Sequence, residues 1–471
     1  MGTRALSPGV LVLAALAAGA GQVREAGGRP AGAPQGVASL SSAGAGGRAG
    51  VRDVLILRRD EPAGRHCPFG GTRITAGVDG DSDGGLSPSE IHESGYVCRF
   101  DRTTHLASRY GAKGDGVTDD TAALQSAIRA TLAQGGRLML DAGKTYRISR
   151  GLNFIGGSRF ELDGRGATLE MAGGAPVSWG YFMLHFAQCS DFTVRDLRLD
   201  ANRKRRTPRE VDAHNVMVVG SRRFAFSRVR SDNAVTDGYY LAARDRARPG
   251  TFCADGLFLE CSADHGYRQG MSIINATRIR IIGGRFTRTR GTPPQAGIDV
   301  ESNRGSAMPG NSDIAIFGAS FTGNAGRGIS LGPEVERPER VTVGHSYFAD
   351  NGGGGVASTG SSVMVLNNLF EDFDASDEGV VRLATRARGS TVAGNVFRRI
   401  HMKSPPRHGV VEVNYGVDNS VRANVFEDVD RVVIRVRGTG NVVEENVVDG
   451  RAQVRARCEA RLYGSHPDCY Y

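Results

Sequence analysis

Two carboxylates stand close together in the segment PPQAGIDVES, which covers residues 293–302. Asp299 and Glu301 are two positions apart and alternate with the apolar residues Ile298 and Val300. On a β-strand this spacing places both carboxylates on one face, because successive side chains point to opposite sides. Such a pair suits acid–base chemistry, but it also suits the solvated face of an ordinary strand.

The same segment belongs to a series of short stretches with a glycine at or near the start: DGYYL, QGMSI, AGIDV, RGISL, GGVAS, EGVVR and HGVVE. If these are stacked strands, the inward row is Tyr239, Met271, Ile298, Ile329, Val356, Val380 and Val410. The outward row is Tyr240, Ser272, Asp299 and Ser330, and a second row includes Asp237, Gln269 and Arg327. Stacked coils lie about 4.8 Å apart, so these polar residues are expected to share one exposed patch with His265, Arg268 and Glu301.

Elimination from a uronate polysaccharide is the first reaction that fits this patch. It needs a positive group that neutralises the carboxylate beside the proton that is removed. Arg268 or Arg327 would supply this charge, or a calcium ion held by Asp237 and Asp299 would supply it. Gln269 and Arg327 are expected to bind the substrate.

The proton transfers of that elimination need a base and an acid. His265 or an arginine would be the base, and Tyr240 the acid. Glycoside hydrolysis is the second reaction, with Asp299 and Glu301 as carboxyl groups at the wider separation of an inverting enzyme. The third hypothesis is a non-catalytic solenoid that binds glycans at a cell surface, although only Tyr239 and Tyr240 offer adjacent rings for stacking on sugars.

Phenylalanine recurs just before a turn along the second half of the chain, at Phe286, Phe321, Phe348, Phe370, Phe397 and Phe426. The steps between them are 35, 27, 22, 27 and 29 residues. Repeats of this size with varying loop lengths predict a solenoid, in which coils stack to bury inner faces that one coil cannot bury alone. The predicted fold class is all-β, with the solenoid over residues 101–455.

The run YGAKGDGVTDDTAALQSAI, residues 110–128, predicts an amphipathic helix ahead of the solenoid. Thr118 is expected to cap this helix, with Asp119 and Asp120 in its first turn. Together with the following GGRLMLDAGKTYRIS, the run resembles the opening of the pectate-lyase-like superfamily of right-handed parallel β-helices. The resemblance implies that the helix plugs the first coil.

The same resemblance implies a lyase, a C5-epimerase or a polygalacturonase-like hydrolase. The paired-Asp and Arg-Ile-Lys strands of polygalacturonases do not occur in the sequence, and neither does the Asp-Pro-His strand of the epimerases. No catalytic assignment therefore transfers from these relatives, and the three activities stay open.

Residues 51–100 are predicted to form a small module around the sequence DGDSDGGLSPSE. Asp79, Asp81 and Asp83 at alternate positions, a glycine at the turn and Glu90 at position twelve match a calcium-binding loop. Calcium prefers several converging oxygens, so structural calcium is the expected cofactor. The segment resembles small Cys-bounded, Asp/Gly-rich modules of secreted bacterial proteins.

The seven cysteines fit an oxidising compartment. Proximity in sequence favours the bridges Cys67–Cys98, Cys253–Cys261 and Cys458–Cys469, which would leave Cys189 free. The last bridge would close a cap over residues 456–471. Connectivity does not follow from sequence alone, so these pairs are expectations.

The N-terminus has the features of an export signal over residues 1–20: a basic start, a short apolar run and small residues for cleavage. Residues 21–50 are rich in Gly, Ala and Ser and are predicted to be a flexible linker. The formal charge is +9, which favours an acidic partner. We expect a secreted or cell-surface monomer without a membrane span that acts on an acidic polysaccharide, not on nucleic acid, with elimination as the first expectation.

Overall fold

The computed structural model of the chain describes residues 37–40, 54–100, 103–175, 181–205, 213–332, 337–374, 379–401, 408–429, 432–449, 451–452, 457–459 and 468–470. The predicted signal peptide lies outside these residues, and so does most of the predicted linker. Within that linker, strand β1 (Val37–Leu40) pairs with β2, which differs from the flexible segment expected there. Among the residues described, no helix has the length and apolar character needed to span a bilayer.

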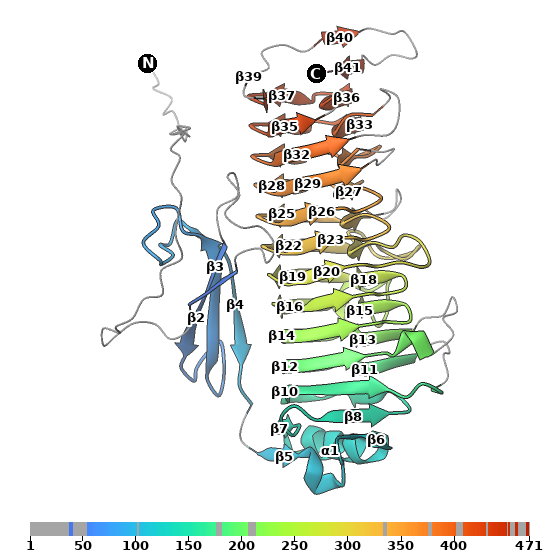
Figure 1. Cartoon of the computed structure of the whole chain (residues 1–471). Helices are drawn as coiled ribbons and strands as arrows, with labels where there is room; N and C mark the ends of the chain where they lie inside the picture. The colour runs from blue at the N-terminus through green and yellow to red at the C-terminus, as the bar shows by residue number, and fades with distance from the viewer. Residues whose placement is uncertain are drawn as a thin grey trace.

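Most of the chain is a parallel β-helix, which confirms the predicted fold class (Figure 1). One sheet contains β10 (Ser158–Met171), β12 (Ser190–Asp200), β14 (Arg222–Asp232), β16 (Cys253–Leu259), β19 (Ala276–Ile282), β22 (Asn311–Phe317), β25 (Glu339–Gly344), β28 (Met364–Leu366), β31 (Thr391–Ala393), β34 (Ser420–Arg422) and β37 (Val442–Glu444). The ladder that continues around the corner contains β17 (Ser262–Asp264), β20 (Arg285–Thr287), β23 (Ser320–Thr322), β26 (Tyr347–Ala349), β29 (Leu369–Asp374), β32 (Val396–His401), β35 (Val425–Val429) and β38 (Val447–Val448).

The sheet that carries the predicted polar patch is called the site sheet below. Its parallel strands are β9 (Leu152–Ile155), β11 (Tyr181–Ala187), β13 (Ala213–Val219), β15 (Asp237–Ala242), β18 (Gln269–Ile273), β21 (Ile298–Val300), β24 (Ile329–Leu331), β27 (Val356–Ser358), β30 (Val381–Leu383), β33 (Val411–Val417) and β36 (Ile434–Thr439). Each glycine-led segment of the sequence forms one of these strands or begins next to one.

The inward row of the site sheet follows the predicted alternation. Tyr239, Met271, Ile298, Ile329 and Val356 are fully buried and occupy successive register positions.

The predicted continuation of that row is one residue out of register. Val356 is paired with Val381, and Val381 with Val411, so Val380 and Val410 precede the row instead of belonging to it. Both are nevertheless buried, like the residues that follow them, Val381 and Val411.

Ladders of identical residues fill the inside of the solenoid. The six predicted phenylalanines stack with ring centroids 4.7–5.6 Å apart. Buried asparagines form a second ladder, in which Asn368 donates to Asn395, Asn395 to Asn424, and Asn424 to Asn446, at 2.9–3.0 Å. Each of these side-chain amides also donates to a backbone carbonyl oxygen. The buried polar groups of the turns are thus satisfied within the protein.

A third ladder alternates in charge on the outer surface. Asp191, Arg223, Asp255, Arg278, Asp313 and Arg340 occupy one left-handed position on six successive coils. Their bidentate ion pairs are Arg223 with Asp191, Arg278 with Asp255, and Arg340 with Asp313. The exposed pairs fasten neighbouring coils to one another.

Helix α1 (Thr121–Gln134) covers the open end of the first coils, beside a 3₁₀ turn (Ala107–Tyr110) and the strands β5 (Thr104–Leu106), β6 (Asp115–Asp119), β7 (Gly136–Met139) and β8 (Thr145–Ile148). Its start differs from the prediction, because Thr118 belongs to β6 and Asp120 is the N-cap residue. The Asp120 carboxylate accepts the backbone N–H groups of Lys113 and Gly114, at 2.6 and 3.0 Å, so it holds the preceding loop.

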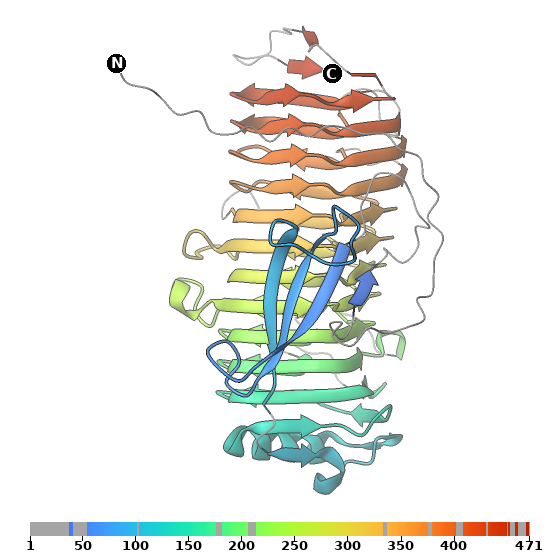
Figure 2. The ribbon, with the colours of Figure 1, turned by 90° about the vertical axis from the view of Figure 1, so that its left-hand side faces the viewer.

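The small module is an antiparallel sheet of β2 (Val54–Glu61), β3 (Gly71–Val78) and β4 (Ile91–Cys98), with β1 at its edge. It stands against the side of the solenoid formed by β12, β14, β16, β19 and β22 (Figure 2). An apolar cluster that includes Ile56, Ile74 and Phe317 fills the contact. Ion pairs of Arg58 with Glu260 and of Arg280 with Glu93 flank this contact.

The cysteines only partly follow the prediction. Cys67 and Cys98 form the expected disulfide. Cys253 and Cys261 are free and buried, so the bridge predicted between them is wrong. Cys253 begins the extended strand β16 and Cys261 follows its end, so the strand alone holds them on the order of 20 Å apart at about 3.3 Å per residue, far beyond disulfide reach.

The chain ends in β39 (Arg451–Ala452), β40 (Arg457–Glu459) and β41 (Asp468–Tyr470). β40 and β41 pair antiparallel, with Cys458 opposite Cys469 in register. The side chains of this segment lie outside the described residues, so the predicted terminal bridge stays a prediction. Cys189 is a free buried thiol, as expected.

Candidate functional site

Asp237, at the first position of β15, is the centre of the polar residues on the site sheet. It is completely buried, and Ser272 Oγ donates to its Oδ2 at 3.0 Å. His214 Nδ1 lies 3.3 Å from the same oxygen, and Arg268 Nη1 lies 3.6 Å from it. Side chains from three successive coils therefore converge on one carboxylate. We call these residues, together with their neighbours Tyr240, Gln269, Asp299 and Glu301, the Asp237 cluster.

His214 is a member of the cluster that the sequence analysis missed. It lies at the second position of β13 and is buried, with its ring stacked on that of Tyr240 at 4.1 Å between centroids. Its coil, AHNVMVV, lacks the leading glycine used to recognise the other strands. The signal that could have found it is the register, since His214 occupies the coil just before Asp237.

Two polar atoms of this pair remain unsatisfied within the described part of the chain. His214 Nε2 and Asp237 Oδ1 are buried and have no hydrogen-bond partner among the residues described. Buried polar atoms normally have partners, and leaving one without a partner costs about 1–3 kcal/mol. Such a cost is more typical of functional sites than of packing.

Asp299 was expected to face solvent, and the structure corrects this. Its side chain points outward from β21 but is only 2% exposed, with Gln269 Nε2 donating to its Oδ2 at 2.6 Å. Burial raises the pKa of Asp299 to about 8, the charge of Glu301 adds to this rise, and Arg268 opposes it. Ser272 and Gln269, expected in the same exposed patch, are buried as well, so the predicted patch is a covered network.

The parts of the cluster that solvent reaches are Arg268, Glu301 and Tyr240. Arg268 Nη2 lies 3.2 Å from Glu301 Oε1, and their side chains are 27% and 31% exposed. Tyr240 is half-buried and carries the stacked His214 ring. A ligand on this face would meet one guanidinium, one phenol and one carboxylate.

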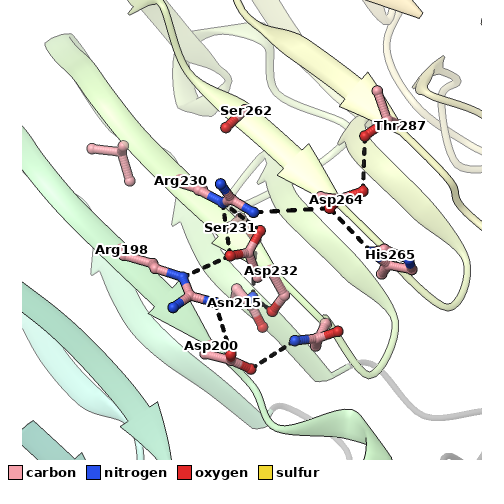
Figure 3. A network of polar contacts seen from close by, with 12 residues as sticks. Arg198, Asp200, Asn215, Arg230, Ser231, Asp232, Ser262, Asp264, His265 and Thr287 are labelled. Carbon is pink, nitrogen blue, oxygen red and sulfur yellow. Dashed lines mark hydrogen bonds and ion pairs between the residues drawn. The ribbon is translucent and has the colours of Figure 1, made fainter. Parts of the chain in front are cut away.

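His265 belongs to a different network, shown in Figure 3. Its Nδ1 lies 3.0 Å from Asp264 Oδ2, in the turn before β18. Asp264 also accepts from Thr287 and pairs with Arg230, which contacts Asp232 at 2.7 Å. This network runs along the corner between the ladders, so the structure does not bring His265 to Asp237 as predicted.

Arg327 is half-buried on the coil after Asp299, and its side chain packs against the following coil. A Cβ added at Gly354 would lie 3.1 Å from Arg327 Nη1, and one at Gly353 would lie 3.0 Å from its Cγ. Gly353 and Gly354 thus provide the space for this arginine, and its packing is directed away from Arg268.

The carboxylates of the cluster are occupied by donors. Asp237 faces Ser272 and Arg268, and Asp299 faces Gln269. This arrangement does not fit the alternative in which Asp237 and Asp299 hold calcium, because a guanidinium beside the carboxylates repels a cation.

The predicted calcium loop lies in the small module, away from the site sheet. Carboxylate oxygens of Asp79, Asp81 and Asp83 converge within 4.8 Å of one another. Glu90 accepts the backbone N–H groups of Ser87 at 2.9 Å and of Gly80 at 2.5 Å, and these hydrogen bonds lower its pKa to about 2. This all-oxygen donor set fits a hard cation such as calcium.

Comparison with known proteins agrees with the fold. A family described as rhamnogalacturonase A/epimerase, pectate lyase-like, matches residues 107–178. A family described as a domain of unknown function (DUF7151) matches residues 54–98, which is most of the small module. The β-helix therefore has the fold of the pectate-lyase-like superfamily.

Individual relatives are more distant. The chain is 36% identical over 127 residues to the capsule K30/K69-specific depolymerase 1 of Klebsiella phage K5-2, which is 26% of this chain and 14% of that protein. It is 29% identical over 254 residues to the mannuronan C5-epimerase AlgE1 of Azotobacter vinelandii, or 47% of this chain and 18% of that protein. The chain thus spans less than a fifth of either curated relative.

Among solved structures, the A-module of the Azotobacter vinelandii mannuronan C-5 epimerase AlgE6 superimposes with a TM-score of 0.56 at 17% identity. The match covers 74% of this chain and all of that module. At this identity it supports the β-helix fold and leaves the chemistry to the residues of the site.

Proposed function

We propose that the β-helix acts on an acidic polysaccharide by removing the proton at C5 of a uronate unit. The observation that carries this proposal is the position of Arg268. Its guanidinium reaches the surface beside Tyr240 and is held between Asp237 and Glu301. The similarity to a mannuronan C5-epimerase and to a capsule depolymerase supports the same substrate class.

Arg268 has the charge that this reaction requires. The C5 proton becomes acidic when the neighbouring carboxylate is neutralised, because the electron pair left on C5 then delocalises into the carboxyl group. A guanidinium presents parallel N–H donors that match a carboxylate. Asp237 and Glu301 fix the guanidinium before substrate arrives, which lowers the entropy cost of orienting it.

Tyr240 is proposed to accept the C5 proton on its phenolate oxygen, next to the positive charge of Arg268. Its ring is fixed by stacking on His214, whose Nδ1 lies against Asp237. Thr236 Oγ1 lies 3.2 Å from the same Nδ1, and these two contacts give the imidazole a defined orientation, which in turn fixes the phenol. Tyr240 is therefore the candidate catalytic residue, and His214 is a positioning residue.

Two products follow from the same intermediate. If a proton returns to C5 from the opposite side of the sugar ring, the unit is epimerised. If the C4–O bond breaks, a C4=C5 double bond forms and the leaving oxygen takes up a proton. We place epimerisation first because of the epimerase relatives, and elimination second.

Hydrolysis has weaker support from the geometry. An inverting hydrolase needs two reachable carboxyl groups. Asp299 is buried and bound by Gln269, so its proton is not presented to a glycosidic oxygen. Glu301 is left as the single reachable carboxylate among the described residues of the cluster.

The test uses polymannuronate and polygalacturonate in D₂O. NMR reports deuterium at C5, absorbance reports unsaturated uronate, and a reducing-end assay reports hydrolysis. We expect deuterium at C5 with wild type, and its loss in Tyr240→Phe and Arg268→Ala but not in the control Arg165→Gln, an exposed arginine elsewhere. New reducing ends without deuterium or absorbance would overturn the proposal, and silence in all three readouts would leave glycan binding without catalysis.

We also propose that the small module binds structural calcium at Asp79, Asp81, Asp83 and Glu90, and that the protein works outside the cell. The convergence of the three aspartates supports the first point. The disulfide Cys67–Cys98, which fits an oxidising compartment, supports the second.

A further inference from the structure

A cleft of about 560 Å³ lies at the start of the site sheet, next to helix α1. One wall is a face of the helix with Gln125 and Arg129, and the other is the turn before β9 with Arg150. Phe182 of β11 closes the end. None of the residues already assigned to the Asp237 cluster lines this cleft.

The charge of the cleft is its first distinguishing property. Arg129 and Arg150 are exposed, and no carboxylate is among the described residues that line the cleft. Arg129 Nη2 donates only to Ser126 Oγ, at 2.9 Å, and Arg150 has no ion-pair partner in the described part of the chain. The surface arginines of the charge ladder, in contrast, are held by aspartates.

A fixed aromatic ring is the second property. A Cβ added at Gly151 would lie 2.3 Å from the Phe182 carbonyl oxygen and 2.7 Å from its ring. The ring therefore packs closely on glycine backbone, and a side chain at position 151 would displace it. Two guanidinium groups without a carboxylate partner among the described residues, beside a half-buried ring, suit a sugar that carries a negative charge, since the ring meets its C–H face.

A row of outward-facing residues on the site sheet links the cleft to the Asp237 cluster. Asn153, His185, Met217 and Tyr240 occupy the same outward position on four successive strands of the site sheet. His185 Nδ1 lies 3.2 Å from Asn153 Oδ1, and burial lowers the pKa of His185, so this row adds no charge at neutral pH. At about 4.8 Å per coil, Asn153 lies roughly 14 Å from Tyr240.

We infer that this cleft is a distal subsite, which binds an acidic sugar unit of the same polysaccharide chain whose reacting unit lies at Arg268 and Tyr240. The inference rests on the proposed function and adds the direction in which the bound glycan lies. The glycan runs across the coils, along the solenoid axis, with one end at helix α1. Long substrates then use both places, and short ones only the reacting place.

The experiment measures fluorescence anisotropy of labelled mannuronate and galacturonate oligomers, as trimers and decamers, with the full-length protein. The variant is Arg129→Gln/Arg150→Gln, and the control Arg165→Gln removes a charge from an exposed arginine outside the cleft. Losing two charged hydrogen-bond donors is expected to weaken decamer binding about tenfold or more. Trimer binding is expected to stay unchanged, and KM for the decamer to rise with kcat constant.

Gly151→Ala, which displaces the Phe182 ring, is expected to weaken decamer binding while both arginines remain. Circular dichroism and thermal unfolding establish that the variants fold. Equal decamer affinity in wild type and the double-arginine variant would overturn the subsite, and so would an equal loss in Arg165→Gln. Wild-type protein that binds neither decamer also overturns it, while deuterium exchange at C5 decides the proposed function separately.

Discussion

Arg268 on one coil of the site sheet is joined to Glu301 on the next by a contact of 3.2 Å between Nη2 and Oε1. The same guanidinium lies 3.6 Å from the buried Asp237. This geometry needs a planar cation that reaches two carboxylates at once, which lysine does not provide. Arg268→Lys is therefore expected to lose activity about 100-fold or more, close to the loss of Arg268→Ala.

The rate of deuterium exchange at C5 measures this effect. A merely structural role would instead lower the unfolding temperature of both variants and leave the activity of the folded fraction intact. Recovery of activity in Arg268→Lys would contradict the two-carboxylate role of this arginine.

Asp299 gives a pH dependence of stability. Its pKa of about 8 lies above that of an unfolded aspartate, about 3.9, so the folded chain holds a proton that the unfolded chain has released. This contribution to stability is complete below about pH 4 and is lost as the pH rises through about 8. Thermal unfolding from pH 5 to 9 should show this decline, and Asp299→Asn should flatten it. The exposed control Asp350→Asn should leave the decline unchanged.

The asparagine ladder predicts a cost for breaking one rung. Asn395→Ala leaves Asn368 without its acceptor and the Val365 carbonyl without a donor. The expected destabilisation is about 1–3 kcal/mol, measured by urea unfolding. Asn303→Ala, at an exposed position, is the matched control. A loss in Asn395→Ala no larger than that of the control would show that the ladder contributes little.

The cysteine chemistry is testable by alkylation without reductant. After unfolding, Cys189, Cys253 and Cys261 should react, and Cys67 and Cys98 should not. Removing the Cys67–Cys98 bridge, which closes a separation of 31 residues, should cost about 4 kcal/mol by the chain-entropy estimate. Peptide mass spectrometry with a Cys253–Cys261 crosslink would contradict the structure.

Calcium should stabilise the small module. Addition of calcium is expected to raise the unfolding temperature of wild type, because a bound ligand stabilises the folded state by mass action. Asp79→Asn/Asp81→Asn should abolish this rise and the calcium heat seen by calorimetry. An equal rise in the variant would mean that calcium acts elsewhere.

The repeat pattern predicted the solenoid well because its signals are local. Each buried phenylalanine and each alternating strand reports on its own coil, and stacking follows from the need to bury inner faces. The positions of Phe286 to Phe426 and the inward row through Val356 were therefore correct. The one-residue register error at Val380 arose at a coil corner, where Val380 and Val381 are both buried.

The site was harder to predict because alternation gives the direction of a side chain but not what covers it. Asp299 points outward, yet it is buried and bonded by Gln269, and burial together with the charge of Glu301 raises its pKa. His214 was missed since its coil lacks the glycine, and His265 was misplaced because the turn carries it to Asp264. The predicted Cys253–Cys261 bridge failed for a similar reason. The two cysteines are close in sequence, but an extended strand holds them far apart in space.

The alternating charge ladder constrains how such a solenoid can change in length. Asp191, Arg223, Asp255, Arg278, Asp313 and Arg340 succeed one another coil by coil, and each meets an opposite charge. Deleting or duplicating a single coil within this stretch would set two like charges face to face, which destabilises neighbouring strands. Changes by two coils preserve the alternation. The charge ladder therefore favours insertions or deletions of two coils over those of one coil.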